Sequence, residues 1–210
     1  MRKRSRLTPV DLDPLPVLTP RLSELVREAD RAADEFVEQT VNSPVPGFVP
    51  SDFGLTARAL MAIRQRSLAS GGTLCEWGSG VGGVTIAASI LGFDAVGIEI
   101  DGGLIEASRE LARKMGVAEA RFFHGSFVPD DADAEVDSTD EIVWLVTGGA
   151  DAHAEMGVGI DDFDVIFAYP WPGEESVIID LFAHRAAVGA LLVTYNGVEG
   201  MRAVRKSSGR

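Results

Sequence analysis

A glycine-rich stretch that begins with an acid is the part of this sequence best suited to ligand chemistry. It reads Glu76-Trp-Gly-Ser-Gly-Val-Gly-Gly, and it follows an apolar run, 73–77, that predicts a strand. The next residues, 82–91, predict a helix rich in Ala and Ile. Glycines in a strand–loop–helix turn let bare backbone approach a ligand, and the N–H groups of the first helical turn face that ligand. Glu99, in a second predicted strand over 95–100, supplies another carboxylate.

The glycines alone leave the type of ligand open. Gly78, Gly80 and Gly83 also satisfy the G-x-G-x-x-G pattern of dinucleotide loops, and Glu99 follows at the offset of about 20 residues where an acid meets a ribose. Glu76 favours a different cofactor, because a carboxylate at the end of the strand would repel a pyrophosphate. The same carboxylate suits a ligand that carries an ammonium and a sulfonium. An NAD-dependent oxidoreductase remains the weaker alternative.

These two segments resemble the class I methyltransferases. Glu76-x-Gly78-x-Gly80-x-Gly82 is similar to their motif I, and Val96 to Asp101 is similar to their second strand with its terminal acid. The resemblance implies a Rossmann-like fold and S-adenosyl-L-methionine as cofactor. It also implies that Glu76 holds the methionine ammonium and that Glu99 takes the ribose hydroxyls. The cofactor-binding loop would comprise Gly78, Ser79, Gly80 and Gly82.

The adenine end departs from the family pattern. Many members carry a carboxylate after the third strand, whereas this chain has Gly125-Ser126-Phe127 after the strand predicted over 120–123. Ser126 can still hydrogen-bond the base, and Phe127 can stack on it. Phe127 can equally be an ordinary core residue.

A second motif follows the fourth predicted strand, 164–168. Tyr169-Pro-Trp171-Pro-Gly-Glu174-Glu175 should lie at the carboxyl edge of the sheet, where ligands bind in such folds. Tyr169 and Trp171 are therefore the candidate catalytic residues, since their rings can align an amine or a cation beside the methyl group. Trp171 can instead be a hydrophobic plug, and the two acids can simply favour a helix start.

That loop also resembles the Asn/Asp-Pro-Pro-Tyr motif of amino-group methyltransferases, but Ala168 or Tyr169 stands where the Asn or Asp would be. The likeness therefore does not imply methylation of a base or an amide. Methyl transfer depends largely on orientation, so a dedicated base is not required. Ser51 and Asp52, in the loop at 47–53, either cover the methionine end of the cofactor or cap the next helix.

The remaining pattern predicts a three-layer α/β/α sandwich with a mostly parallel Rossmann-like sheet and an N-terminal helical extension. We expect a flexible lead over residues 1–20, a helix and loop over 21–50, and the S-adenosylmethionine-binding domain over 51–210. Helices are expected near 22–41, 53–68, 104–115 and 174–187, and a fifth strand at 190–195. Within the long connection 128–162, residues 142–146 can form a strand or a short helix. Gly197 to Arg210 predicts a short helix and a basic tail rather than a final hairpin, and the unpaired edge would suit a homodimer.

Composition narrows the function further. The net charge of −13 disfavours a nucleic-acid substrate, because phosphate binding needs clustered Lys and Arg. A single cysteine, Cys75, fits a reducing compartment, so we expect a cytoplasmic protein. No apolar run suits a signal peptide or a membrane span, and the scattered histidines predict no metal site. The sequence thus favours a methyltransferase acting on a small molecule or a protein side chain. A non-catalytic binding or assembly protein is the main alternative.

Overall fold

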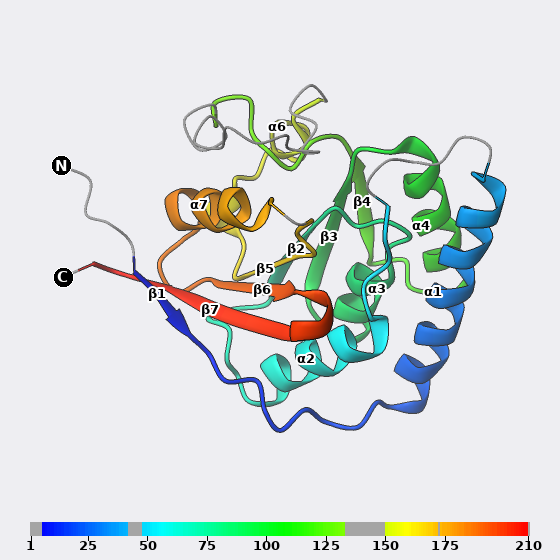
Figure 1. The fold of residues 1–210 in the computed structure, drawn as a ribbon, viewed down its shortest axis with the longest axis horizontal. Coiled ribbons are helices and arrows are strands. Elements are labelled where there is room, and N and C mark those ends of the chain that lie inside the picture. The colour runs from blue at the N-terminus through cyan, green and yellow to red at the C-terminus, as the bar shows by residue number, and fades with distance from the viewer. Residues whose placement is uncertain (1–5, 42–47, 133–149, 172, 210) are drawn as a thin grey trace.

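The computed structural model describes residues 6–41, 48–132, 150–171 and 173–209. Within these ranges a seven-stranded sheet carries helices on both faces (Figure 1). The strands are β1 (Arg6–Pro9), β2 (Thr73–Trp77), β3 (Asp94–Glu99), β4 (Arg121–His124), β5 (Val165–Ala168), β6 (Leu191–Tyr195) and β7 (Met201–Ser207). The helices are α1 (Pro20–Gln39), α2 (Phe53–Gln65), α3 (Gly83–Ile90), α4 (Gly102–Lys114), α6 (Ala152–Met156) and α7 (Glu175–Arg185), with short 3₁₀ turns η1 (Ile160–Asp162) and η2 (Gly197–Glu199).

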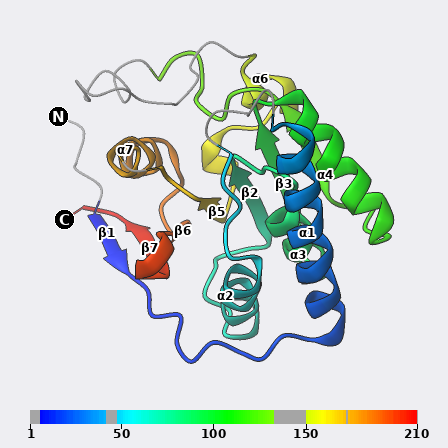
Figure 2. The ribbon, with the colours of Figure 1, turned by 45° about the vertical axis from the view of Figure 1, so that its right-hand side comes forward.

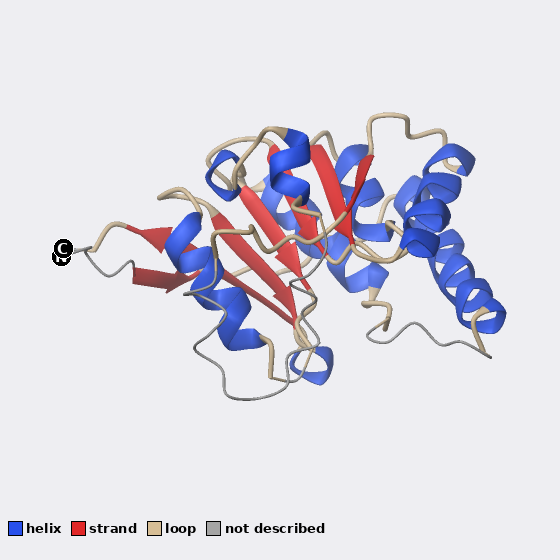
Figure 3. Ribbon diagram, turned by 90° about the horizontal axis from the view of Figure 1, so that it is seen from above, coloured by secondary structure: helices blue, strands red, loops and turns tan. Residues whose placement is uncertain are grey.

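The sheet has the order β1-β7-β6-β5-β2-β3-β4. The five strands from β6 to β4 are parallel to their neighbours, whereas β7 runs antiparallel to β6 and to β1. Figure 3 shows these strands side by side as one twisted layer. The expected α/β sandwich with a mostly parallel sheet is therefore confirmed.

Alternating side chains of the strands fill two separate cores. One face packs Leu74, Val165 and Phe167 against α1 to α4, and the other packs Cys75 and Ile166 against α7 and the α6 region. Figure 2 shows α1 to α4 on one side of the sheet and α7 on the other. Because both faces are covered, the central strands are apolar at nearly every position, as parallel strands usually are.

Local signals place the helices close to where the sequence predicts them. Pro20 occupies the first turn of α1, and the backbone N–H of Leu22 donates to the Thr19 hydroxyl at 3.3 Å. Asp52 caps α2 by accepting from the Leu55 N–H at 2.8 Å, and Asp101 caps α4 by accepting from the Leu104 N–H at 2.9 Å. The capping interpretation of Asp52 is thus confirmed, and Asp101 serves in the same way.

The expectation of a flexible N-terminal lead is wrong for residues 6–19. Arg6–Pro9 pairs with β7, and Leu12 is buried in the larger core. Arg58 fastens the segment to α2, because its guanidinium donates to the backbone carbonyls of Pro16 (2.8 Å) and Leu15 (3.3 Å). The prolines exclude a helix here but allow an extended strap at the edge of the sheet.

The expectation that no final hairpin exists is also wrong. After β6 the chain turns through η2 and returns as β7, which pairs with β6 from Leu191↔Arg205 to Tyr195↔Met201. The edge of β6 is therefore occupied by β7 and not open. This removes the reason for expecting a homodimer at that edge, and the oligomeric state stays a prediction.

The long connection between β4 and β5 is described only in part. Ser126 and Asp151 form a parallel bridge, after which α6 and η1 lead into β5. Residues 142–146, for which a strand or a helix was expected, lie outside the described residues. No helix in the described ranges is both long and apolar enough to span a membrane.

Candidate active site

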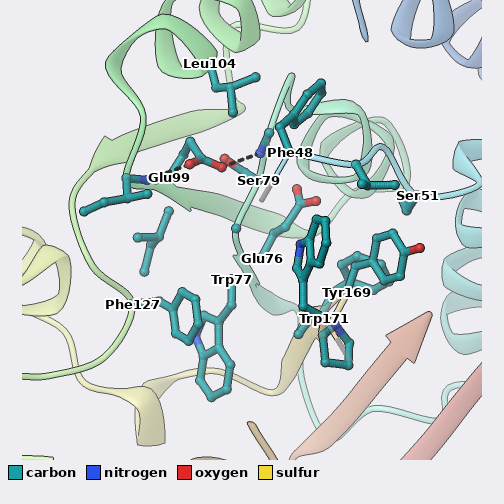
Figure 4. A pocket seen from close by; sticks show the side chains of 18 of the residues that line it. Phe48, Ser51, Glu76, Trp77, Ser79, Glu99, Leu104, Phe127, Tyr169 and Trp171 are labelled. Carbon is teal, nitrogen blue, oxygen red and sulfur yellow. Dashed lines mark hydrogen bonds between the residues drawn. The ribbon is translucent and has the colours of Figure 1, made fainter. Parts of the chain in front are cut away.

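A pocket opens where β2, β3 and β5 end at the carboxyl edge of the sheet. The glycine loop forms its floor, the residues after β4 and β5 form two sides, and Phe48 to Ser51 form a third. Figure 4 shows Glu99 on one side of the Glu76 carboxylate and the rings of Tyr169 and Trp171 on the other. The structure thus brings together candidate residues of five separate chain segments, whereas Gly82 is not among the lining residues, since a Cβ there would face Phe122 and Ser108.

The glycine loop adopts a backbone that only glycine accepts easily. Gly78, Gly80 and Gly82 all have positive φ, at +74°, +52° and +81°. A Cβ on Gly78 would meet nothing within 4 Å, so this backbone faces open space in the pocket. A Cβ on Gly80 would lie 2.9 Å from the Phe48 ring. The loop therefore leaves room for a ligand at Gly78 and is covered by an aromatic ring at Gly80.

The loop is held down on the neighbouring strand. The N–H groups of Gly78 and Ser79 both donate to the Ile98 carbonyl at 2.9 Å. Gly97 makes this close approach possible, since a Cβ there would lie 2.7 Å from the Ser79 Cβ. Gly97 belongs to the second-strand motif, but the spacing of that motif gives no sign of this contact.

Glu76 is the most unusual group in the pocket. Its side chain is only 3% exposed, and Oε2 accepts from the Thr85 hydroxyl at 2.6 Å and from the Thr85 N–H at 2.9 Å. Burial raises the pKa of Glu76 from 4.5 to about 8, even though the bonds from Thr85 favour the charged form. The nearby Glu99 charge adds to the rise. A carboxyl this reluctant to ionise gains most from a ligand that brings its own positive charge.

Glu99 ties the glycine loop to the start of α4. Its Oε2 accepts from the Gly80 N–H at 2.8 Å, and its Oε1 accepts from the N–H groups of Ile100 (2.8 Å) and Asp101 (3.0 Å). Burial raises the pKa of Glu99, and these three bonds oppose the rise. Two carboxylate oxygens offer about four acceptor sites, so capacity remains for a ribose hydroxyl.

At the expected adenine end, the structure places Ser126 and Phe127 in the pocket wall. The Ser126 hydroxyl accepts from the Val128 N–H at 3.0 Å and still has a proton to donate. The Phe127 ring stacks on Trp77, with centroids 5.2 Å apart and planes 7° apart. One face of Phe127 is therefore occupied by Trp77, a wall residue that the sequence analysis missed.

At the opposite end, Tyr169 and Trp171 line the pocket as expected from the loop after β5. The Tyr169 ring packs against Tyr195 at the end of β6, at a centroid distance of 4.8 Å and an angle of 60°. Glu174 closes the loop, because its Oε2 accepts from the Trp171 N–H at 3.1 Å. Burial raises the pKa of Glu174, which is 8% exposed. Glu175 only accepts from the Gly173 N–H at 3.0 Å and is exposed.

The loop before α2 contributes one expected residue and one that was missed. Ser51 lines the pocket, whereas Asp52 serves as the helix cap. Phe48 also lines the pocket, and its ring contacts Phe36 edge-on at 5.3 Å. A single aromatic residue in a Pro/Gly loop carries no spacing signal, so the sequence could not identify it.

The charged side chains that line the pocket are all acidic among the described residues. Three carboxylates line the pocket, those of Glu76, Glu99 and Glu174, and none of the described lining residues is Lys, Arg or His. A polyanion such as a pyrophosphate would find no cationic partner among these side chains. The arrangement therefore favours a ligand with positive groups.

No family model matches the chain, and no curated protein sequence matches it. Solved structures do resemble it. A methyltransferase from Geobacter sulfurreducens is 12% identical, with a TM-score of 0.51 over 91% of this chain and 100% of that chain. An RNA methyltransferase from Salinibacter ruber in complex with S-adenosyl-L-homocysteine is 20% identical (TM-score 0.46, covering 79% of this chain and 93% of that chain). An O-methyltransferase from Bacillus cereus, also in complex with that product, is 14% identical (TM-score 0.49, covering 87% and 68%).

At these identities the likeness concerns the fold alone. The Geobacter structure is similar over 91% of this chain and all of that chain, and this chain itself has a mostly parallel sheet covered by helices on both faces. The chain therefore has the Rossmann-like fold of the class I methyltransferases.

Proposed function

We propose that the chain is an S-adenosylmethionine-dependent methyltransferase that acts on a small molecule or a protein side chain. The observation that carries the proposal is Glu76, a buried carboxyl at the end of β2 whose pKa is raised to about 8. Within the described part of the chain, Thr85 occupies only Oε2. The other oxygen remains available to the ammonium of a methionine moiety.

Other residues fit the rest of the cofactor. Gly78 offers open backbone, Glu99 keeps acceptor capacity for a ribose, and Ser126 keeps a donor for the base. When bound, S-adenosylmethionine supplies a methyl group on a positively charged sulfur. The chain contributes orientation and exclusion of water, the terms that dominate a displacement of this kind. Tyr169 and Trp171 are the residues that we propose to hold the acceptor at the reacting end.

Two alternative functions remain to be tested against the methyltransferase proposal. A non-catalytic binding or assembly protein would use the same pocket without turnover, and an NAD-dependent oxidoreductase would use the same glycines. The second is disfavoured by the absence of a cationic side chain among the described lining residues. A cytoplasmic location remains a prediction that depends on the single cysteine.

Calorimetric titration with S-adenosylhomocysteine, and with NADH as the control, tests the proposal. We expect the former to bind and NADH to give no heat of binding. We expect Glu76→Gln to weaken binding at least tenfold, because the neutral amide loses the charge that an ammonium needs. Exposed Glu106→Gln on α4 is the matched control and should bind as the unmodified protein does. Binding of NADH alone, or equal affinity of all three proteins, would contradict the proposal. Incubation with labelled S-adenosylmethionine and a cell extract then separates an enzyme from a protein that only binds.

A further inference from the structure

The pocket has a second end that the cofactor residues do not account for. Glu76 and Glu99 lie at the ends of β2 and β3, whereas Tyr169, Trp171 and Glu174 follow β5, the neighbour of β2 on its other side. We call this group, together with Tyr195 behind Tyr169, the acceptor mouth. If the cofactor spans β2 and β3, the acceptor mouth is where the methyl acceptor must enter.

Aromatic rings and carboxylates dominate the acceptor mouth. The Tyr169 and Tyr195 rings meet edge to face at 4.8 Å, and the Trp171 indole stands on the same loop as Tyr169. Glu174 is only 8% exposed, and the hydrogen bond from the Trp171 N–H in the described structure uses Oε2 and not Oε1. The faces of such rings attract cations, and a carboxylate beside them adds a charge partner.

The surroundings reinforce the negative potential. Burial raises the pKa of the Tyr195 hydroxyl, and the charge of Asp52 adds to the rise. Burial also raises the pKa of Asp30 on α1, and Asp52 again adds to it. An anionic acceptor would therefore meet carboxylates on several sides and no described cationic side chain in the lining. A cationic acceptor would find both ring faces and a charge partner.

We propose that the methyl acceptor is an amine that binds as its cation against the rings of Tyr169 and Trp171 and the carboxylate of Glu174. Before transfer, the ammonium would pass a proton to the Glu174 carboxylate. The freed nitrogen lone pair would then form the new N–C bond while the methyl S–C bond breaks and leaves S-adenosylhomocysteine. The inference depends on the proposed methyltransferase function, since it assigns the substrate class of that same pocket. It selects amines from the broader range of small molecules and side chains. In this assignment Glu174 both binds the cation and takes its proton, and Tyr195 is a positioning residue that supports the Tyr169 ring.

The test uses two probes of nearly equal shape and different charge. Choline carries a quaternary ammonium, and 3,3-dimethylbutan-1-ol carries a neutral carbon in its place. Each is titrated into the full chain after saturation with S-adenosylhomocysteine, whose own binding is measured first. We expect choline to bind at least tenfold more tightly than the neutral alcohol.

Two neighbouring acids provide matched variants. Glu174→Gln keeps an oxygen for the Trp171 N–H but loses the charge, so we expect its choline affinity to fall about tenfold. Glu175→Gln makes the same change one residue later, on an exposed side chain outside the pocket lining, and should leave choline binding unchanged. Unchanged affinity for S-adenosylhomocysteine in both variants would show that the pocket is intact.

The outcomes separate the inference from the function on which it depends. Binding of S-adenosylhomocysteine with equal affinity for both probes would overturn the amine assignment and leave the methyltransferase proposal standing. Equal effects of the two glutamate variants would also overturn it. If Glu174→Gln weakened S-adenosylmethionine and left choline unaffected, the carboxylate would serve the sulfonium instead. Failure to bind S-adenosylhomocysteine at all would overturn both proposals.

Discussion

Glu76 shows at the scale of one residue how a site conflicts with the stability of its own fold. The carboxyl is buried, Thr85 is its one hydrogen-bond partner among the described residues, and its pKa rises from 4.5 to about 8. Below pH 4.5 it is protonated in both the folded and the unfolded chain. Between pH 4.5 and 8 the unfolded chain releases this proton while the folded chain retains it, so the free energy of unfolding falls as the pH rises. Above about pH 8 the free energy of unfolding falls no further through this group.

We therefore predict that Glu76→Gln stabilises the cofactor-free protein, and that the gain increases from pH 5 to pH 9. The shift corresponds to about 5 kcal/mol as an upper figure. Urea unfolding of both proteins at pH 5, 7 and 9 measures the difference. Glu106→Gln, on an exposed side chain, should show a difference that does not change with pH. A constant difference for Glu76→Gln across the range would show that the carboxyl is not held protonated by the fold.

The residues that the sequence could not identify share a physical cause. Glu76, Glu99 and the glycines can be recognised from their spacing in the sequence alone, without any knowledge of the fold. Phe48 and Tyr195 line or support the pocket only because distant segments meet there. Trp77 lies within the glycine motif, but its role as a wall residue comes from its stacking on the distant Phe127. Tyr195 is the partial exception, because adjacent parallel strands bring the residues after β5 and β6 to one edge.

At the scale of elements, the turn between β2 and α3 depends on glycine for two separate reasons. Gly80 has a φ of +52°, which disfavours any side chain, and a Cβ there would lie 2.9 Å from Phe48. Gly116, at the end of α4, has a similar φ of +63° but no atom within 4 Å of a Cβ. The two positions therefore separate backbone strain from steric contact.

We predict that Gly80→Ala and Gly116→Ala each lower the free energy of unfolding by about 1 kcal/mol through strain. Only Gly80→Ala should also weaken S-adenosylhomocysteine, by at least tenfold, because Phe48 must move and the Gly80 N–H holds Glu99 at 2.8 Å. Calorimetric titration and urea unfolding of both variants measure the two effects. Equal affinity of the two variants would mean that the conformation at Gly80 is irrelevant to the ligand.

The strands with a clear hydrophobic pattern could be predicted from the sequence, whereas the last strand, β7, could not. The residues of β7 read as a basic tail because Arg202, Arg205 and Lys206 interrupt the apolar positions. In the fold, the Arg205 guanidinium donates to the carbonyls of Gly189 and Leu68, and the Lys206 ammonium donates to those of Ala186 and His184. These cations satisfy carbonyls at the ends of other elements instead of facing water, and only the tertiary structure makes them compatible with a strand.

At the scale of the whole molecule, the N-terminal segment, residues 6–19, connects the edge of the sheet at β7 to helix α1. It starts as β1 beside β7, crosses the end of α2, where Arg58 donates to Pro16 and Leu15, and enters α1 at Pro20. Leu12 belongs to the same core as α1 to α4, and Leu15 and Leu18 pack against it. The segment therefore contributes to the stability of the domain that carries the site, although none of its described residues lines the pocket.

We predict that Leu12→Ala lowers the free energy of unfolding by about 2–4 kcal/mol, because a buried leucine loses its packing and leaves a cavity. Val17→Ala is the matched control within the same segment, since Val17 is 86% exposed and should change stability by less than about 0.5 kcal/mol. Thermal and urea unfolding of the two variants provide the comparison. Affinity for S-adenosylhomocysteine at 15 °C should be the same in both, because neither side chain lines the pocket. If Leu12→Ala were as stable as Val17→Ala, the segment before α1 would not contribute to the packing of the core. If it lost affinity while remaining folded, the strap would instead act on the site through α1 and α2.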